Sequence, residues 1–126
     1  MDFRGYKDLE CYKKARELRI LVSVFANKFP AHEKFLLAAQ IKDASRSISA
    51  NISEGYGRYT YADTKNFFII SRGSVCETME HLQTAHDENY LTMEEFSEGA
   101  NLCEHVFKLV NGYISYLNKQ NSIKKI

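Results

Sequence analysis

The sequence predicts an all-α protein, namely an antiparallel four-helix bundle with up-down-up-down topology. Apolar residues recur every three or four positions in four long segments, which is the spacing of one face of an α-helix. One proline and six glycines interrupt the 126 residues very little, as long helices allow and turn-rich sheet proteins do not. Short connections between long helices make consecutive helices antiparallel. We expect one domain over residues 1–126, with a frayed polar tail over 118–126.

The first predicted helix spans about Lys7–Lys28, and the second spans about Glu33–Tyr56. The Phe-Pro pair that contains Pro30 ends the first helix, since a residue before proline avoids the α region. Gly55 and Gly57 are predicted to end the second helix in the left-handed conformation. The predicted inward stripes are Cys11, Ala15, Leu18, Val22, Phe25 and Phe29 in the first helix, and Leu37, Ile41, Ala44, Ile48, Ile52 and Gly55 in the second.

Capping signatures open the last two predicted helices. Thr60-x-x-Asp63 begins the third helix, which continues to about Glu88, and Thr92-x-x-Glu95 begins the fourth. The predicted inward stripes are Phe68, Ser71, Val75, Thr78, Leu82 and Ala85 in the third helix, and Phe96, Gly99, Cys103, Val106, Val110, Tyr113 and Leu117 in the fourth.

Two helices carry apolar residues away from the inward stripe, more than one core needs. Contiguous exposed apolar residues usually mark an interface, so we expect a homo-oligomer. A glycine inside a helix costs about 1 kcal/mol relative to alanine, and Gly73 therefore predicts close approach by another backbone. The expected interface residues are Leu9, Ile20 and Val24 on the first helix and Ile69 and Ile70 on the third.

The formal net charge is only +1, but the charges are unevenly distributed. Residues 1–60 hold 11 Lys and Arg against 7 Asp and Glu, whereas residues 61–126 hold 6 against 9. The basic half could contact nucleic acid, above all if the chain forms a ring that presents the basic residues several times. Alternatively, it could pair with the acidic half, either inside the fold or between copies of the chain. The candidate phosphate contacts are Lys13, Arg16, Arg19, Lys42, Arg46 and Arg58.

The end of the second predicted helix is rich in polar residues at helical spacing. Asn51 and Glu54 lie on one edge beside the apolar stripe, where they could make hydrogen bonds between helices, with Glu54 meeting Arg72, or could contact a ligand. The segment 55–61 combines two glycines, Arg58 and three tyrosines. Arginine beside aromatic rings can hold single-stranded bases, but the tyrosines could equally pack over the end of the bundle.

We expect no catalytic residues, metal or cofactor. The sequence contains no Glu-x-x-His motif of the kind that holds metals in bundles, and its four histidines form no ligand cluster. Cys11, Cys76 and Cys103 form no Cys-x-x-Cys pair and are interpreted as core or interface residues. No apolar run approaches the roughly 20 residues that span a bilayer, and no secretory signal opens the chain, so we expect a cytoplasmic protein with no membrane partner.

Several motifs follow one another in order along nearly the whole chain. They are Phe3-x-x-Tyr6-Lys7-Asp8-Leu9, Phe29-Pro30-x-x-Glu33, Gln40-Ile41, Ser47-Ile48-x-x-Asn51-Ile52-x-Glu54-Gly55-x-Gly57-Arg58, Arg72-Gly73-Ser74 and Asn89-Tyr90-Leu91. With these motifs the chain resembles the four-helix bundle proteins encoded in intervening sequences of bacterial 23S ribosomal RNA genes, also labelled S23 ribosomal proteins. That family includes the accessory variability determinant of diversity-generating retroelements, a pentameric barrel that binds nucleic acid and a reverse transcriptase through basic surfaces.

The resemblance implies a bacterial, non-enzymatic, pentameric ring that serves as an RNA- or DNA-associated scaffold. Within the motifs, Asn51, Glu54, Gly55, Gly57, Arg72 and Gly73 would be structural residues. Family members commonly carry two basic residues after Gln-Ile, where this chain has Lys42-Asp43, so we expect weaker nucleic-acid binding here.

Two other functions stay open from the sequence. The main alternative is a protein-only adaptor that docks another protein, for example a reverse transcriptase, through its outer faces and Tyr56, Tyr59 and Tyr61. A metal-dependent bundle enzyme ranks third.

Overall fold

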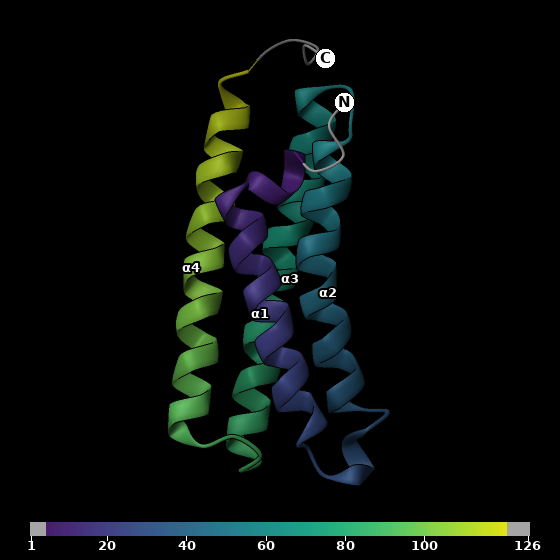
Figure 1. The fold of residues 1–126 in the computed structure, drawn as a ribbon, viewed down its shortest axis with the longest axis vertical. Coiled ribbons are helices and arrows are strands. Elements are labelled where there is room, and N and C mark those ends of the chain that lie inside the picture. The colour runs from purple at the N-terminus through teal and green to yellow at the C-terminus, as the bar shows by residue number, and fades with distance from the viewer. Residues whose placement is uncertain (1–4, 121–126) are drawn as a thin grey trace.

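The computed structural model describes residues 5–120 and contains four long α-helices, with no β-strand in that part of the chain (Figure 1). Two short 3-10 helices precede the first and second of them. In chain order the elements are η1 (Gly5–Asp8), α1 (Glu10–Asn27), η2 (Ala31–Glu33), α2 (Leu37–Tyr56), α3 (Tyr61–Asp87) and α4 (Met93–Asn118).

Each α-helix packs against the next one in the chain, and α4 closes the bundle by packing on α1. Figure 1 shows α1 and α3 running in one direction, with α2 and α4 running in the other. Within the described residues, the backbones of the diagonal pairs α1–α3 and α2–α4 do not approach each other closely. The predicted antiparallel up-down-up-down bundle is therefore confirmed, and the outer surfaces of α1 and α3 lie on opposite sides of the molecule.

The predicted inward stripes form the core. The largest fully buried side chains are Phe68, Leu18, Ile41, Ile48, Ile52 and Leu82. The two capping signatures are confirmed as well, because the Thr60 Oγ1 atom accepts from the Asp63 N–H group at 3.1 Å and Thr92 forms a full capping box with Glu95. Of the predicted tail, Asn118 ends α4, and residues 121–126 lie outside the described residues.

The first two helices begin later than predicted. Gly5–Asp8 form a separate 3-10 turn, and α1 starts at Glu10. Similarly, α2 starts at Leu37 rather than at Glu33. The Glu33 carboxylate accepts the Leu37 N–H group at 3.3 Å, so its side chain satisfies one of the free N–H groups at the start of α2. The negative charge of an acidic side chain near a helix N-terminus also interacts favourably with the helix dipole.

The prediction that Gly55 and Gly57 end α2 in the left-handed conformation is wrong. No glycine among residues 5–120 has a positive φ, and Gly57 has φ −80°. The helix ends instead in tighter turns, with the Gly57 and Arg58 N–H groups donating to the carbonyls of Glu54 and Gly55 at 3.1 Å. Gly55 is required for packing, since a Cβ atom there would lie 2.8 Å from the Cβ atom of Phe67.

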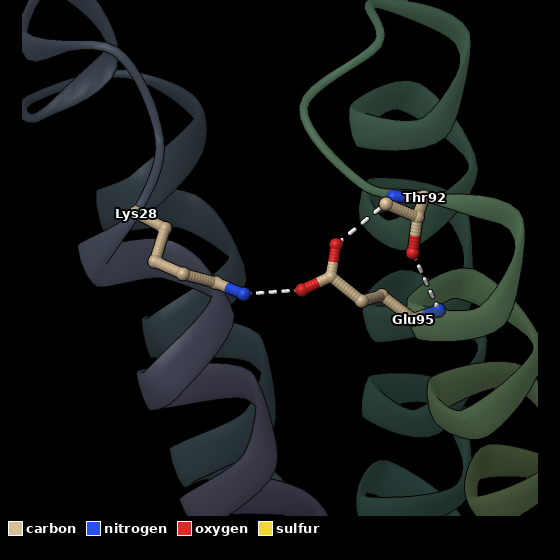
Figure 2. Close-up of polar contacts among 3 residues, drawn as sticks. All are labelled: Lys28, Thr92 and Glu95. Carbon is tan, nitrogen blue, oxygen red and sulfur yellow. Dashed lines mark hydrogen bonds and ion pairs between the residues drawn. The ribbon is translucent and has the colours of Figure 1, made fainter.

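At one end of the bundle, two glutamates each cap a helix and join two connections. The Glu95 carboxylate accepts the Thr92 N–H group at 2.9 Å and pairs with Lys28 at the end of α1 (Figure 2). The Glu33 carboxylate, besides capping α2, accepts the Tyr90 hydroxyl at 2.9 Å from the α3–α4 connection. The hydrogen bond from Lys28 lowers the pKa of the Glu95 carboxyl, and the bond to Glu33 raises the pKa of the Tyr90 hydroxyl.

We predict that Glu95→Ala lowers the free energy of unfolding at neutral pH by about 1 kcal/mol, because it removes half of the capping box and the Lys28 pair. The folded-state pKa of Glu95 is lowered, so its contribution is present above the unfolded-state pKa and is lost as pH falls through the folded-state value. Urea titrations should therefore show a difference that shrinks in acid. Glu94→Ala, in the same helical turn but without a cap bond or ion pair, is the control.

A second prediction concerns Gly55. Gly55→Ala should destabilise the fold by about 1–3 kcal/mol, because the new methyl group would collide with Phe67 and the Phe68 ring. Gly112→Ala is the matched control, since a Cβ atom there meets nothing within 4 Å, and it should stabilise α4 by about 1 kcal/mol. Equal chemical denaturation midpoints for both variants would contradict the close contact at Gly55.

Candidate nucleic-acid interface

A groove of about 300 Å³ runs between α1 and α2 on the outside of the bundle. Its walls combine two exposed apolar side chains, Ile20 and Val24, with three cations and no carboxylate. The lining residues are Arg19, Ile20, Ser23, Val24, Asn27, Lys42, Ser45 and Arg46. Packing of α1 on α2 brings Arg19 of α1 together with Lys42 and Arg46 of α2, three of the candidate phosphate contacts.

The cations of this groove have polar but uncharged partners. Arg19 donates to the Ser49 hydroxyl at 3.4 Å, and Lys42 donates to the Asn27 amide oxygen at 2.7 Å. Asp43, which follows Lys42 in the sequence, is exposed but does not line the groove. Within residues 5–120 no carboxylate lies at ion-pair distance from Arg19, Lys42 or Arg46, so their positive charge is not neutralised inside the chain.

The basic strip continues along α1 beyond the groove. A second hollow of about 480 Å³ is lined by Lys7, Glu10, Tyr12, Lys13, Lys14, Arg16 and Glu17. Here the lysines are partly neutralised, because Lys13 pairs with Glu10 at 3.4 Å and Lys14 pairs with Glu17 at 2.9 Å. Arg16 is exposed and pairs with no carboxylate of the described residues.

Arg58 lies apart from these cations, about 18 Å along α2 from Arg46 at the helical rise per residue. Its guanidinium pairs with Glu54 at 3.0 Å and lies 4.4 Å from the centroid of the Phe67 ring. Tyr56 of the same segment packs on Tyr6, with ring centroids 6.5 Å apart. The helix-two terminus therefore mainly packs over the end of the bundle.

Within residues 5–120, only Ser47 on the polar edge of α2 makes a hydrogen bond to another helix, whereas Asn51 bonds within α2. The Ser47 and Ser74 hydroxyl oxygens lie 2.8 Å apart across α2 and α3, and the Asn51 amide donates to Ser47 at 3.0 Å. Glu54 does not meet Arg72, contrary to the expectation. Glu54 faces solvent, and Arg72 is turned toward α4, where it donates to the Asn111 amide oxygen at 2.9 Å.

Sequence reasoning missed two buried hydroxyl groups that join α2 to α3. Ser71 donates to the carbonyl of Ile48, and Thr64 donates to the carbonyl of Gly55, each at 2.8 Å. Both hydroxyls are completely buried. The predicted inward stripe contained Ser71 but not Thr64, and it gave no bonding partner for either residue. These bonds satisfy groups that would otherwise be costly to bury.

Four of the five expected interface residues are exposed: Ile20 is 44%, Val24 53%, Ile69 39% and Ile70 52% accessible. The expectation for Leu9 is wrong, because Leu9 is partly buried against the core just before α1. Among residues 5–120, nothing lies within 4 Å of where a Cβ atom at Gly73 would be, so no backbone of that part of the chain approaches it.

Phe35 is a further exposed apolar residue that the sequence did not single out. It is 83% accessible and lies in the connection before α2, next to Leu36, which is also exposed. The sequence prediction had placed Phe35 inside the second helix, and the Phe-Leu-Leu run just before the inward stripe was the available signal.

Among residues 5–120, no three His, Cys, Asp or Glu side chains gather in a way that could hold a metal ion. No helix in the same range is long and apolar enough to cross a membrane. Cys11 and Cys103 lie in the core, and burial raises the pKa of their thiols to about 11 and about 12 respectively, whereas Cys76 is exposed on α3.

These features define an antiparallel helical bundle with a basic, partly apolar groove on its outer surface. The chain belongs to the 23S rRNA-intervening sequence protein family, whose model matches residues 7–112. A crystal structure of a protein of unknown function from the S23 ribosomal protein family of Bacteroides thetaiotaomicron has a similar fold, with a TM-score of 0.78. The two chains are 24% identical over 83% of this chain and 95% of that one. Among curated proteins, none matches this chain. The resemblance drawn from the motifs is thus confirmed.

We predict that a thiol reagent leaves Cys11 and Cys103 unlabelled in the folded protein. Their raised pKa values leave about one Cys11 thiol in a thousand and about one Cys103 thiol in ten thousand ionised near pH 8, and the core excludes the reagent. Mass spectrometry should find both labelled in urea. Labelling of either at native pH without unfolding would contradict its place in the core.

Proposed function

We propose that this chain is a non-enzymatic, homo-oligomeric bundle that associates with RNA or DNA through the cations of α1 and α2. The observation that carries the proposal is the set of cations without carboxylate partners in the described residues, Arg16, Arg19, Lys42 and Arg46. Unpaired guanidinium groups are suited to phosphate, because they present several N–H donors in a planar fork.

Oligomerisation would multiply a weak basic surface. One chain carries a net charge of only +1, which by itself supports little attraction to a polyanion. Several copies in a ring, a pentamer in our proposal, would repeat the basic strip and bind one nucleic acid at several points, raising the effective affinity without any new contact. The exposed Ile20, Val24, Ile69 and Ile70 support such an assembly.

The family name supports the choice of partner, since it associates these proteins with intervening sequences of 23S ribosomal RNA. In this proposal Lys13 and Arg58 add secondary phosphate contacts, because each already pairs with a glutamate of its own helix. The protein would act in the cytoplasm as a scaffold and would need no cofactor.

A protein-only adaptor is the second candidate function. It is favoured by the apolar residues Ile20 and Val24 inside the basic groove and by the exposed Phe35 and Leu36, since phosphate offers no apolar contact. The partner in that case would be another protein, for example a reverse transcriptase. Capture that persists after nuclease treatment would favour the adaptor.

We predict that binding of a structured RNA weakens steeply with added salt, because cations of the protein displace counterions from phosphate. Fluorescence anisotropy should show a log–log slope of about −0.7 to −0.9 for each phosphate contact. Arg16→Gln should make the slope shallower by about 1 for each copy of the chain that contacts the RNA, and it should weaken binding evenly across RNA sequences.

The matched control for this test is Lys108→Gln. Lys108 is an exposed cation of α4 that pairs with Glu104 at 3.1 Å, outside the proposed surface, so its loss should leave the slope unchanged. A flat salt response, or no binding to structured RNA or DNA, would refute nucleic-acid association.

A further inference from the structure

The outer face of α3 is apolar at its centre and acidic toward its C-terminal end. Ile69, Ile70, Gly73, Glu77 and Glu80 are all exposed, and their spacing of three or four residues places them on one face of the helix. Neither Glu77 nor Glu80 has a cation at ion-pair distance within the described residues. This face therefore carries uncompensated negative charge beside uncovered apolar surface.

The α1–α2 groove has the opposite charge and the same mixed character. Arg19, Lys42 and Arg46 lack carboxylate partners in the described part, and Ile20 and Val24 are its exposed apolar side chains. The lengths also agree: at 1.5 Å per residue the groove runs for about 12 Å along α1, and the α3 face for about 16 Å. Opposite charge and exposed apolar side chains on both surfaces make the α3 face of a second copy a suitable partner for this groove.

We propose that the α3 face of one copy of this chain seats in the α1–α2 groove of a second copy. Ile69 and Ile70 would meet the apolar groove residues, Glu77 and Glu80 would face the groove cations, and Gly73 would let the partner approach closely. The proposal rests on the proposed homo-oligomer and deepens it by naming the two surfaces that meet.

The geometry of the bundle makes this contact head to tail. Because α1 and α3 are diagonal, the groove and the α3 face point to opposite sides of the molecule. Each copy therefore offers one of each surface, and repetition closes a ring or extends a filament. Arg19, Lys42 and Arg46 would then face the α3 carboxylates of the neighbouring copy. In such an assembly the nucleic-acid contacts of the proposed function narrow to Arg16, which does not line the groove, with Lys13 and Arg58 as secondary contacts.

Gly73→Gln tests the close approach without touching the fold of one chain, because the position faces open space. The nuclease-treated variant should associate with itself about tenfold more weakly, measured by analytical ultracentrifugation. Gly112→Gln is the control: Gly112 also faces open space, but it lies on α4 near Lys108 and Ser115. Circular dichroism should show equal helix content in the two variants. Unequal helix content would mean that a side chain at position 73 disturbs the fold of the single chain, and this result would overturn the proposal.

Charge reversal tests the electrostatic match. Arg46→Glu alone and Glu80→Lys alone should each reduce self-association, and the double variant Arg46→Glu/Glu80→Lys should recover it, because every groove then meets an α3 face of opposite charge. Labelling of the exposed Cys76 on α3 gives a second readout, since wild type should be labelled more slowly at high concentration than Gly73→Gln. If Gly73→Gln and both single charge variants each assemble as strongly as the wild type, the proposal is overturned.

The outcomes separate this inference from the proposed function. A wild-type protein that stays monomeric at high micromolar concentration would overturn both the head-to-tail contact and the homo-oligomer. An oligomer that assembles through the two surfaces but binds no RNA or DNA would support the contact and refute nucleic-acid association alone. An Arg16→Gln variant that loses RNA affinity and keeps its assembly would support the division of the cations.

Discussion

Packing of each helix against its neighbour in the chain is the constraint on which the other features depend. Short connections place α2 beside α1 and α3 beside α2, and α4 then closes on α1, so that α1 and α3 end up diagonal (Figure 1). This arrangement joins the basic strips of α1 and α2 into one groove. It also turns the surplus apolar residues of α1 and α3 to opposite sides, where one chain cannot cover both.

The net charge is small, but positive and negative charges are separated on the surface of the bundle. Carboxylates neutralise Lys13, Lys14 and Arg58 within single helices, whereas the groove cations and the α3 carboxylates have no counterion in the described residues. Solvent tolerates such charges on a surface at little cost. Their segregation next to apolar side chains is better explained by recognition than by stability, because exposed ion pairs contribute little to folding and much to the choice of partner.

The end of the bundle that holds the α1–α2 and α3–α4 connections relies on side chains that serve two purposes. Glu33 caps α2 and binds Tyr90, and Glu95 caps α4 and binds Lys28 (Figure 2). Each glutamate caps a helix with one bond and, with its other bond, joins the two connections at this end of the bundle.

The sequence by itself determined the helical class, the inward stripes, and the starts of α3 and α4 at Thr60 and Thr92, because helical period and capping act between residues a few positions apart. The six cations could be found from the sequence, but the grouping of Arg19, Lys42 and Arg46 into a groove with Ile20 and Val24 could not. Only the tertiary structure decided that Arg72 meets Asn111 rather than Glu54, that Leu9 packs on the core, and that Gly55 serves packing against Phe67. Such contacts join residues far apart in the chain, and they depend on how the helices are rotated and how far they are shifted along one another, which no local spacing encodes.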